Sequence, residues 1–356
     1  MAAPLFTVER RTRASGAGLG LGVVGILALA SLPWWGGAAT MRFAIEVGAT
    51  LSLAVLWNLL AGYAGLVSVG QQGFVGIGGY SLFGLTMLLG IPPMLALPLA
   101  GIIAGAVAIP TALLLFRLRG AYLAIGTWVM AEIFRLGLSQ YYALGGGSGA
   151  SLSLTVVRQL GASRDARESL SYFLALALTI GTLALVYFLL RSRQGLALTA
   201  IRDSETASAS LGVDNARLKL GVYVVTAMVT GVIGALIFLV KLRISPDAAF
   251  SLLDWTANII FIVVIGGIGT IEGPIVGTIV FFALRSALAN YGTWYMILFG
   301  VIAIAVMLKA PRGLWGFVAQ RYDLHFFPVQ RRLRLQAGPA GVAGEAPSGN
   351  AVRDGA

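Results

Sequence analysis

The sequence predicts an all-α, polytopic integral membrane protein of about ten transmembrane helices, within a range of eight to ten, from three observations. Hydrophobic residues make up 58% of the 356 positions before 47 glycines are counted, and charged residues make up only 11%. A soluble domain is about 45–50% apolar with glycine included and about 25% charged, so this composition argues against a soluble enzyme. The third observation is a series of uncharged stretches near the ~20 residues that a membrane helix needs.

Charged residues are costly in lipid, so the gaps between them place the spans. The first four spans are expected at about 17–35, 43–62, 72–90 and 94–116. The other six are expected at about 120–140, 169–190, 220–240, 255–271, 274–290 and 286–308. A re-entrant segment at 63–80 would reduce the count to eight or nine. The first helix is expected to be retained, because its apolar run is too long for a typical signal peptide and lacks an A-x-A-like site.

The basic residues predict the orientation of these spans. With the N-terminus inside, the inner segments hold 17 lysines and arginines and the outer segments hold 6. Cytosolic loops of membrane proteins carry such an excess, so both termini are expected in the cytosol. The chain divides into an N-terminal tail at 1–16, a transmembrane permease domain at 17–311, and a basic, then disordered, tail at 312–356. The net charge of +11 therefore marks the cytosolic face and needs no nucleic acid to explain it.

The inner loop at 191–219 is the most informative segment outside the membrane. Asp203 or Ser204 can cap a short helix, and Glu205 lies in its positive first turn. Gly212 suits the position that ends this helix, and an aspartate two residues later caps the segment that enters the next span. Such a helix predicts either a docking element for a cytosolic partner or a connector on the lipid headgroups. These residues alone leave both readings open.

Two glycine-rich regions, 58–80 and 266–277, interrupt the predicted spans. Irregular backbone at membrane depth is tolerated where protein or a water-filled cavity satisfies it, and paired interruptions often flank a substrate path. Close helix packing explains most of these glycines, but the adjacent amides of Gln71 and Gln72 favour the path. The candidate path residues are Asn58, Gln71, Gln72, Phe74, Tyr80, Glu132, Gly267 and Thr270.

Charged residues inside or beside the spans are expected to pair. Glu132 and Arg135 are three positions apart and share one helix face, where they could be functional or structural. Arg42 and Glu46, four apart near the outer interface, are expected to be structural. Arg285 has no sequence-local partner, so we expect it to meet an acidic group on another span or subunit.

The chain lacks the residues of an energy source of its own. None of its three lysines follows a glycine, so a P-loop for ATP is absent. With no cysteine and one histidine, His325, neither a metal site nor a nucleophile–base pair is expected. A proton-coupled carrier would need mid-membrane carboxylates, for which only Glu132 qualifies. Another chain is therefore expected to bind ATP.

Five motifs, in order along about 45–320, resemble those of the membrane permease subunits of bacterial ABC importers for branched-chain amino acids, of the LivM type. The first motif appears as Asn58, Gly62, Tyr63, Gly65, Ser68 and Gly70, and the second as Arg117, Arg119, Gly120, Tyr122, Ala124 and Ile125. The others appear at 205–212, 266–274 and 311–314. The chain departs from the family at Gln71-Gln72, where many relatives have His-Ala, and at Ala207-Ser208, where they have paired alanines.

The resemblance implies the ABC importer permease fold in the bacterial inner membrane, and a role as a transport subunit rather than an enzyme. It implies three kinds of protein partner: a second homologous permease, two cytosolic ATPases and a periplasmic substrate-binding protein. The ATPase-coupling residues would be Arg202, Asp203, Glu205, Ala207 and Gly212. This chain would bind no cofactor, and its partners would use ATP. The substrate would be a branched-chain amino acid; urea, short amides, or a stand-alone carrier or channel are the alternatives.

Overall fold

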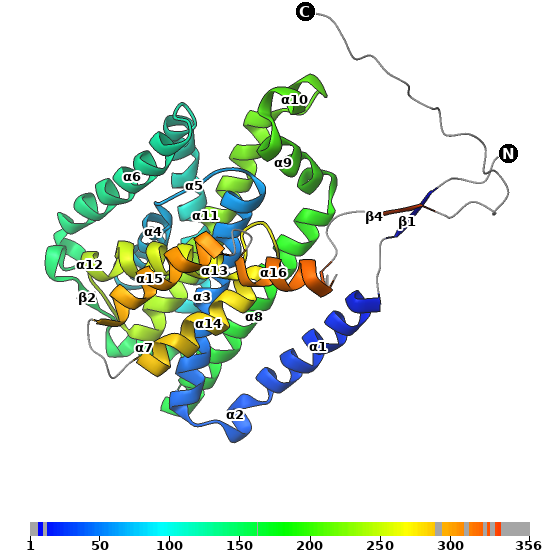
Figure 1. Ribbon diagram of the computed structural model, residues 1–356. Coiled ribbons are helices and arrows are strands. Elements are labelled where there is room, and N and C mark those ends of the chain that lie inside the picture. The colour runs from blue at the N-terminus through cyan, green and yellow to red at the C-terminus, as the bar shows by residue number, and fades with distance from the viewer. Residues whose placement is uncertain are drawn as a thin grey trace, which may run out of the picture.

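The computed structural model describes residues 6–9, 13–161, 163–288, 294–309, 313–322, 326–327 and 332–335. It is a bundle of helices with one helical arm, α9 and α10, projecting at one end (Figure 1). Helix α6 lies along one flank of the bundle, and α1 lies along the other (Figure 1). The prediction of an all-α permease therefore agrees with the architecture of the described residues.

The first half of the chain alternates long helices with short turns. Its helices are α1 (Arg13–Ala30), α2 (Leu32–Trp35), α3 (Ala38–Asn58), α4 (Gln71–Met87), α5 (Pro93–Leu115), α6 (Ala121–Ser139), α7 (Leu154–Gln159) and α8 (Arg164–Arg191). A π-helical turn, η1 (Leu59–Tyr63), extends α3, and two 3₁₀ turns, η2 (Tyr142–Leu144) and η3 (Gly146–Ser148), follow α6. Pro92 and Pro93 lie at the start of α5, where proline's fixed φ suits a helix N-terminus.

The second half contains the arm and four more long segments. Its helices are α9 (Arg193–Asp203), α10 (Glu205–Ser210), α11 (Asn215–Lys241), α12 (Pro246–Ala249), α13 (Asn258–Gly266), α14 (Glu272–Leu288), α15 (Trp294–Lys309) and α16 (Gly313–Tyr322). A second π-helical turn, η4 (Leu253–Ala257), precedes α13. Two antiparallel strand pairs complete the described elements: β1 (Phe6–Glu9) with β4 (Arg332–Leu335), and β2 (Ala150–Ser151) with β3 (Arg243–Ile244).

Six segments of the described chain are long and apolar enough to cross a membrane: Ala38–Tyr63, Pro93–Leu115, Ala121–Ser139, Arg164–Arg191, Asn215–Lys241 and Pro246–Gly266. Four further helices, α1, α4, α14 and α15, occur where spans were predicted but have only 16 to 18 residues. At ~1.5 Å per residue, a 16-residue helix rises about 24 Å, which is less than the ~30 Å hydrocarbon thickness. The count of ten spans is therefore not confirmed.

Glycines allow the central helices α4, α5 and α11 to approach closely. A Cβ atom added at Gly78 of α4 would collide with the backbone carbonyl of Gly231 of α11, and one at Gly234 would collide with the backbone of Val75. Such contacts bring two helix backbones together without intervening side chains. At these positions the structure agrees with the interpretation that the glycines serve helix packing.

The chain is non-helical at 64–70, between η1 and α4, within the stretch where a re-entrant segment was considered. Most of this segment is buried, and other parts of the protein satisfy its backbone. The indole nitrogen of Trp57 donates to the carbonyl of Ser68 at 2.7 Å, and the amide of Val69 donates to the Thr127 hydroxyl at 2.9 Å. Irregular backbone is tolerated in a membrane protein under this condition.

Candidate functional site

The tip of the projecting arm has the caps that the sequence predicts. The Ser204 hydroxyl accepts from the backbone amide of Ala207 at 3.2 Å, so Ser204 rather than Asp203 caps α10. Gly212 has a φ of +83°, a left-handed conformation that favours glycine at a helix end. The carboxylate of Asp214 accepts from the amide of Arg217 at 3.0 Å and caps α11. Local residues therefore define where α10 and α11 begin.

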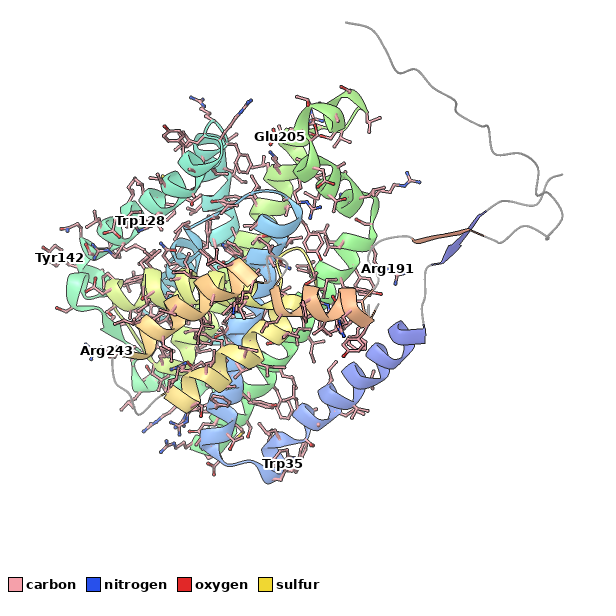
Figure 2. The ribbon with its side chains drawn as sticks, in the orientation of Figure 1. Trp35, Trp128, Tyr142, Arg191, Glu205 and Arg243 are labelled. Carbon is pink, nitrogen blue, oxygen red and sulfur yellow. The ribbon has the colours of Figure 1, made fainter. Side chains whose placement is uncertain are left out.

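Side chains brace α10 against the first turns of α11. The Asn215 amide donates to the Glu205 carbonyl at 2.8 Å, and the Ser208 hydroxyl donates to the Asn215 side-chain oxygen at 3.0 Å. The Glu205 carboxylate forms an ion pair with Lys219. Figure 2 places Glu205 on the projecting arm, away from the bundle. Leu211 is 81% exposed at the tip, so the arm presents an apolar side chain outward on a fixed helical turn.

Arg202, at the end of α9, points back towards the bundle. Its Nη1 donates to the backbone carbonyl of Gly62 in η1 at 2.8 Å, and its Nη2 lies 2.9 Å from the carboxylate of Asp203. A Cβ atom added at Gly65 or at Gly269 would lie 3.4 Å from Arg202 atoms. Arg202 therefore connects the arm to both glycine-rich interruptions, a contact that sequence spacing could not predict.

Asn58 joins the same two interruptions from within the bundle. Its side-chain nitrogen donates to the Thr270 carbonyl at 2.7 Å, and its side-chain oxygen accepts from the Gly269 amide at 2.8 Å. Thr270 in turn donates to the Gly267 carbonyl at 2.9 Å. Three predicted path residues, Asn58, Gly267 and Thr270, are therefore brought together. The Asn58 amide is buried and bonded to backbone, so in this conformation it fixes the 267–270 turn.

The predicted path residues of α4 lie inside the protein. The Gln71 side-chain nitrogen donates to the Leu53 carbonyl at 3.0 Å, and the Gln72 side-chain oxygen accepts from the Thr256 hydroxyl of η4. Phe74 is buried edge-on against Tyr223, with ring centroids 5.6 Å apart. Within the described residues, the Gln71 side-chain oxygen has no hydrogen-bond partner. These side chains therefore connect α4 to neighbouring elements in this conformation.

Glu132 lies elsewhere, on α6. It pairs with Arg135 at 2.5 Å, as the spacing predicts, and Arg135 also reaches Asp247 of α12 at 2.9 Å. Glu132 is 43% exposed, so it faces outward rather than towards Asn58. Tyr80 is buried and stacked on Phe250, with ring centroids 6.1 Å apart.

A cavity of about 400 Å³ lies at the end of the bundle opposite the arm, between α3, α11, η4, α13 and α14. It is lined by Arg42, Ile45, Glu46, Ala49, Thr50, Ile237, Val240, Lys241, Asp254, Trp255, Asn258, Phe281 and Arg285. The eight predicted path residues are not among these side chains. Of the residues that line the cavity, the sequence analysis singled out Arg285. Because Arg285 lacks a sequence-local partner, an acidic group was expected near it on another span or subunit.

Ion pairs across helices hold the rim of this cavity. Arg285 of α14 pairs with Glu46 of α3 at 2.6 Å, which confirms the expectation for Arg285. The expected pair of Arg42 with Glu46 is wrong, because Arg42 reaches Glu168 of α8 at 3.1 Å instead. Each long side chain extends to a neighbouring helix rather than along its own. Among the described residues, no group of three or more histidines and carboxylates could hold a metal ion.

The C-terminal motif is described only in part. Gly313 has a φ of +71° and packs against the backbone of Gly267, so the start of α16 closes over the 267–270 turn. Pro311, Arg312 and His325 lie outside the described residues, as do half of the N-terminal tail and most of the tail from 312 onward.

Comparison with known proteins gives one family. The sequence profile described as branched-chain amino acid transport system / permease component matches residues 39–310. Two similar proteins carry the name high-affinity branched-chain amino acid transport system permease protein LivM. The one from Escherichia coli strain K12 is 30% identical over 82% of this chain and 74% of its own length. The one from Salmonella typhimurium strain LT2 is 30% identical over 72% of this chain and 65% of its own length, just under two thirds. No solved structure matches the chain.

Proposed function

Because the chain belongs to the family of permease components of branched-chain amino acid transport systems, we propose that it is one of two membrane-spanning subunits of an ATP-driven importer. Members of this family are transport subunits, and the long apolar helices of this chain fit a multi-pass membrane permease. The proposed partners are a homologous second permease, two cytosolic ATPases and a periplasmic binding protein. The subunit would lie in the bacterial inner membrane with both termini in the cytosol, and it would bind no cofactor itself.

The observation that carries the coupling mechanism is the contact of Arg202 with η1. Closure of the ATPases would displace α10, which is braced on α11 and continuous through Ser204 with α9. Arg202 would transmit that displacement to the Gly62 carbonyl, and Asn58 would pass it to the 269–270 turn. Both interruptions would then move together, opening the path between the two permeases alternately to each side of the membrane.

The proposed substrate is leucine, isoleucine, valine or a related apolar amino acid. The similar proteins are named as branched-chain amino acid permeases, and their names support the same substrate class here. Urea and short amides are the second candidate, since the sequence departs from the family at Gln71-Gln72. Both glutamines are buried in this conformation, so a change of substrate through them would require α4 to move.

The test is ATP-dependent uptake of radiolabelled leucine by the complete complex reconstituted in proteoliposomes. We expect Arg202→Ala to reduce uptake at least about tenfold, because a charge-assisted hydrogen bond contributes about 1.5–3 kcal/mol. The ATPases should still co-purify with this variant, because Arg202 faces the bundle. Glu205→Ala and Gly212→Pro should reduce uptake by disturbing α10. Arg193→Ala is the matched control for Arg202→Ala. It removes an arginine from the first turn of α9, the helix that ends beside Arg202, and should retain uptake.

The outcomes separate the candidate functions. Normal uptake by the Arg202→Ala, Glu205→Ala and Gly212→Pro variants would contradict the coupling mechanism. Uptake of leucine by this chain without ATP or partners would identify a stand-alone carrier. Uptake of labelled urea but not of leucine by the wild-type complex would change the substrate class and leave the coupling mechanism intact.

A further inference from the structure

The cavity opposite the arm is placed where an entering substrate would first meet the protein. Helix α11 begins beside α10 and ends at Lys241, which lines the cavity. Its 27 residues rise about 40 Å at ~1.5 Å each, so the arm and the cavity lie at opposite ends of the bundle. Figure 2 shows Glu205 on the arm and Trp35, which precedes the start of α3, at the opposite end of the bundle. If the arm is cytosolic, the cavity opens towards the outer side.

Two charged side chains of opposite sign in the cavity lining form no ion pair within the described part of the chain. Its rim pair, Glu46 with Arg285, is satisfied at 2.6 Å. Within the described residues, the Lys241 ammonium and the Asp254 carboxylate have no ion-pair partner. The Lys241 ammonium lies 4.9 Å from the centre of the Trp255 ring, in a cation–π contact. This contact leaves its N–H groups able to donate to a bound anion.

The rest of the lining is apolar. Ile45, Ala49, Ile237 and Phe281 are buried side chains from three helices, and they form a wall against which an aliphatic group could pack. The volume of about 400 Å³ falls within the ~300–1,000 Å³ of typical small-molecule sites. Such sites combine apolar walls with a few polar groups that fix the orientation of the ligand.

We propose that this cavity binds an α-amino acid zwitterion with an apolar side chain and is the receiving site of the permease. The carboxylate of the ligand would face Lys241, its ammonium group would face Asp254, and its side chain would lie on the wall of Ile45 and Phe281. This inference rests on the proposed function for the substrate class, but it assigns a site that the sequence motifs do not include. A ligand of the same size with only a positive charge would pair with Asp254 alone, and one with only a negative charge would pair with Lys241 alone.

The test is equilibrium binding to the complete permease–ATPase complex in nanodiscs, without the binding protein. Radiolabelled L-leucine is the probe, and the competitors are 3-methylbutylamine, which lacks the carboxylate, and 4-methylpentanoate, which lacks the ammonium group. We expect Asp254→Asn and Lys241→Gln each to weaken leucine binding about 10- to 100-fold, the loss of one charge-assisted hydrogen bond. Asp165→Asn, which removes an exposed carboxylate outside the cavity in the first turn of α8, is the matched control.

The competitors distinguish recognition from a structural role. Asp254→Asn should leave the competition by 4-methylpentanoate unchanged, and Lys241→Gln should leave the competition by 3-methylbutylamine unchanged, because each competitor lacks the group whose partner was removed. Equal weakening of all three ligands would overturn the proposal, as would unchanged leucine binding or no binding by the wild-type complex. ATP-dependent leucine import by the wild-type complex, reconstituted in proteoliposomes with its binding protein, would show in each of those cases that the proposed function stands without this site.

Discussion

Replacing Gly78 with alanine tests whether the closeness of α4 and α11 is essential to the bundle. The added Cβ atom would meet the backbone carbonyl of Gly231 at less than van der Waals distance. A carbonyl in the middle of a helix cannot rotate away as a flexible side chain can, so the two helices must separate by about 1.5 Å to restore a contact near 3.5 Å. Overpacking of this kind costs about 1–3 kcal/mol, occasionally more.

Gly84 supplies a control for Gly78 within α4. A Cβ atom there would lie 3.9 Å from the Leu144 side chain, which is an ordinary contact. Alanine is favoured over glycine in a helix by up to about 1 kcal/mol, so Gly84→Ala should be neutral or stabilising. We expect Gly78→Ala to lower the thermal midpoint of the detergent-solubilised protein by several degrees, measured by size-exclusion chromatography of a fluorescent fusion. Equal midpoints for the two variants would refute the packing argument.

Three further predictions concern other parts of the molecule. Asn58→Leu should lower the same midpoint and abolish most uptake, because it leaves two partly buried backbone groups unsatisfied at up to about 1–3 kcal/mol each; an unchanged midpoint would contradict this. Glu46→Arg and Arg285→Glu should each lower the midpoint slightly, since this half-exposed pair contributes at most about 1 kcal/mol, and the double exchange should restore it. Leu211→Cys, the sole cysteine in the chain, should react with a membrane-impermeant maleimide in inside-out vesicles only, and reaction in right-side-out cells would reverse the orientation.

Features determined by neighbouring residues were the ones that the sequence predicted well. Ser204 and Gly212 delimit the short helix of the arm because capping requires only a hydroxyl and a left-handed residue at fixed offsets. The positions of the long helices follow for a similar reason, because an apolar run of sufficient length identifies a span without reference to its neighbours. The predicted caps and helices are therefore found close to their predicted residues.

Features determined by tertiary contacts could not be predicted. The interpretation of Gln71 and Gln72 as path residues stays a prediction. Their hydrogen-bond partners in the structure are the Leu53 carbonyl and the Thr256 hydroxyl, and Thr256 is 184 positions away from Gln72. The resemblance implies a coupling role for Arg202, and the structure adds a contact of its guanidinium with the Gly62 carbonyl. Spacing along the chain carries no information about either contact.

Helix α3 connects the two ends on which the proposals depend. It carries Glu46 and Ala49 into the cavity opposite the arm, and its last residue, Asn58, holds the 269–270 turn beside Arg202. From Ala38 to Tyr63 the segment is continuous, with the π-helical turn η1 as its one irregular part. A helix transmits a displacement along its length, whereas a π-helical turn is a local departure that often marks functional sites. We therefore expect a displacement of Gly62 to act first through η1 and then to move the cavity wall.

Binding of leucine to the cavity opposite the arm should accordingly weaken when ATP closes the ATPases in the wild-type complex. This dependence on ATP should disappear in the Arg202→Ala variant. If leucine binding is independent of ATP in both, α3 does not link the arm to the cavity.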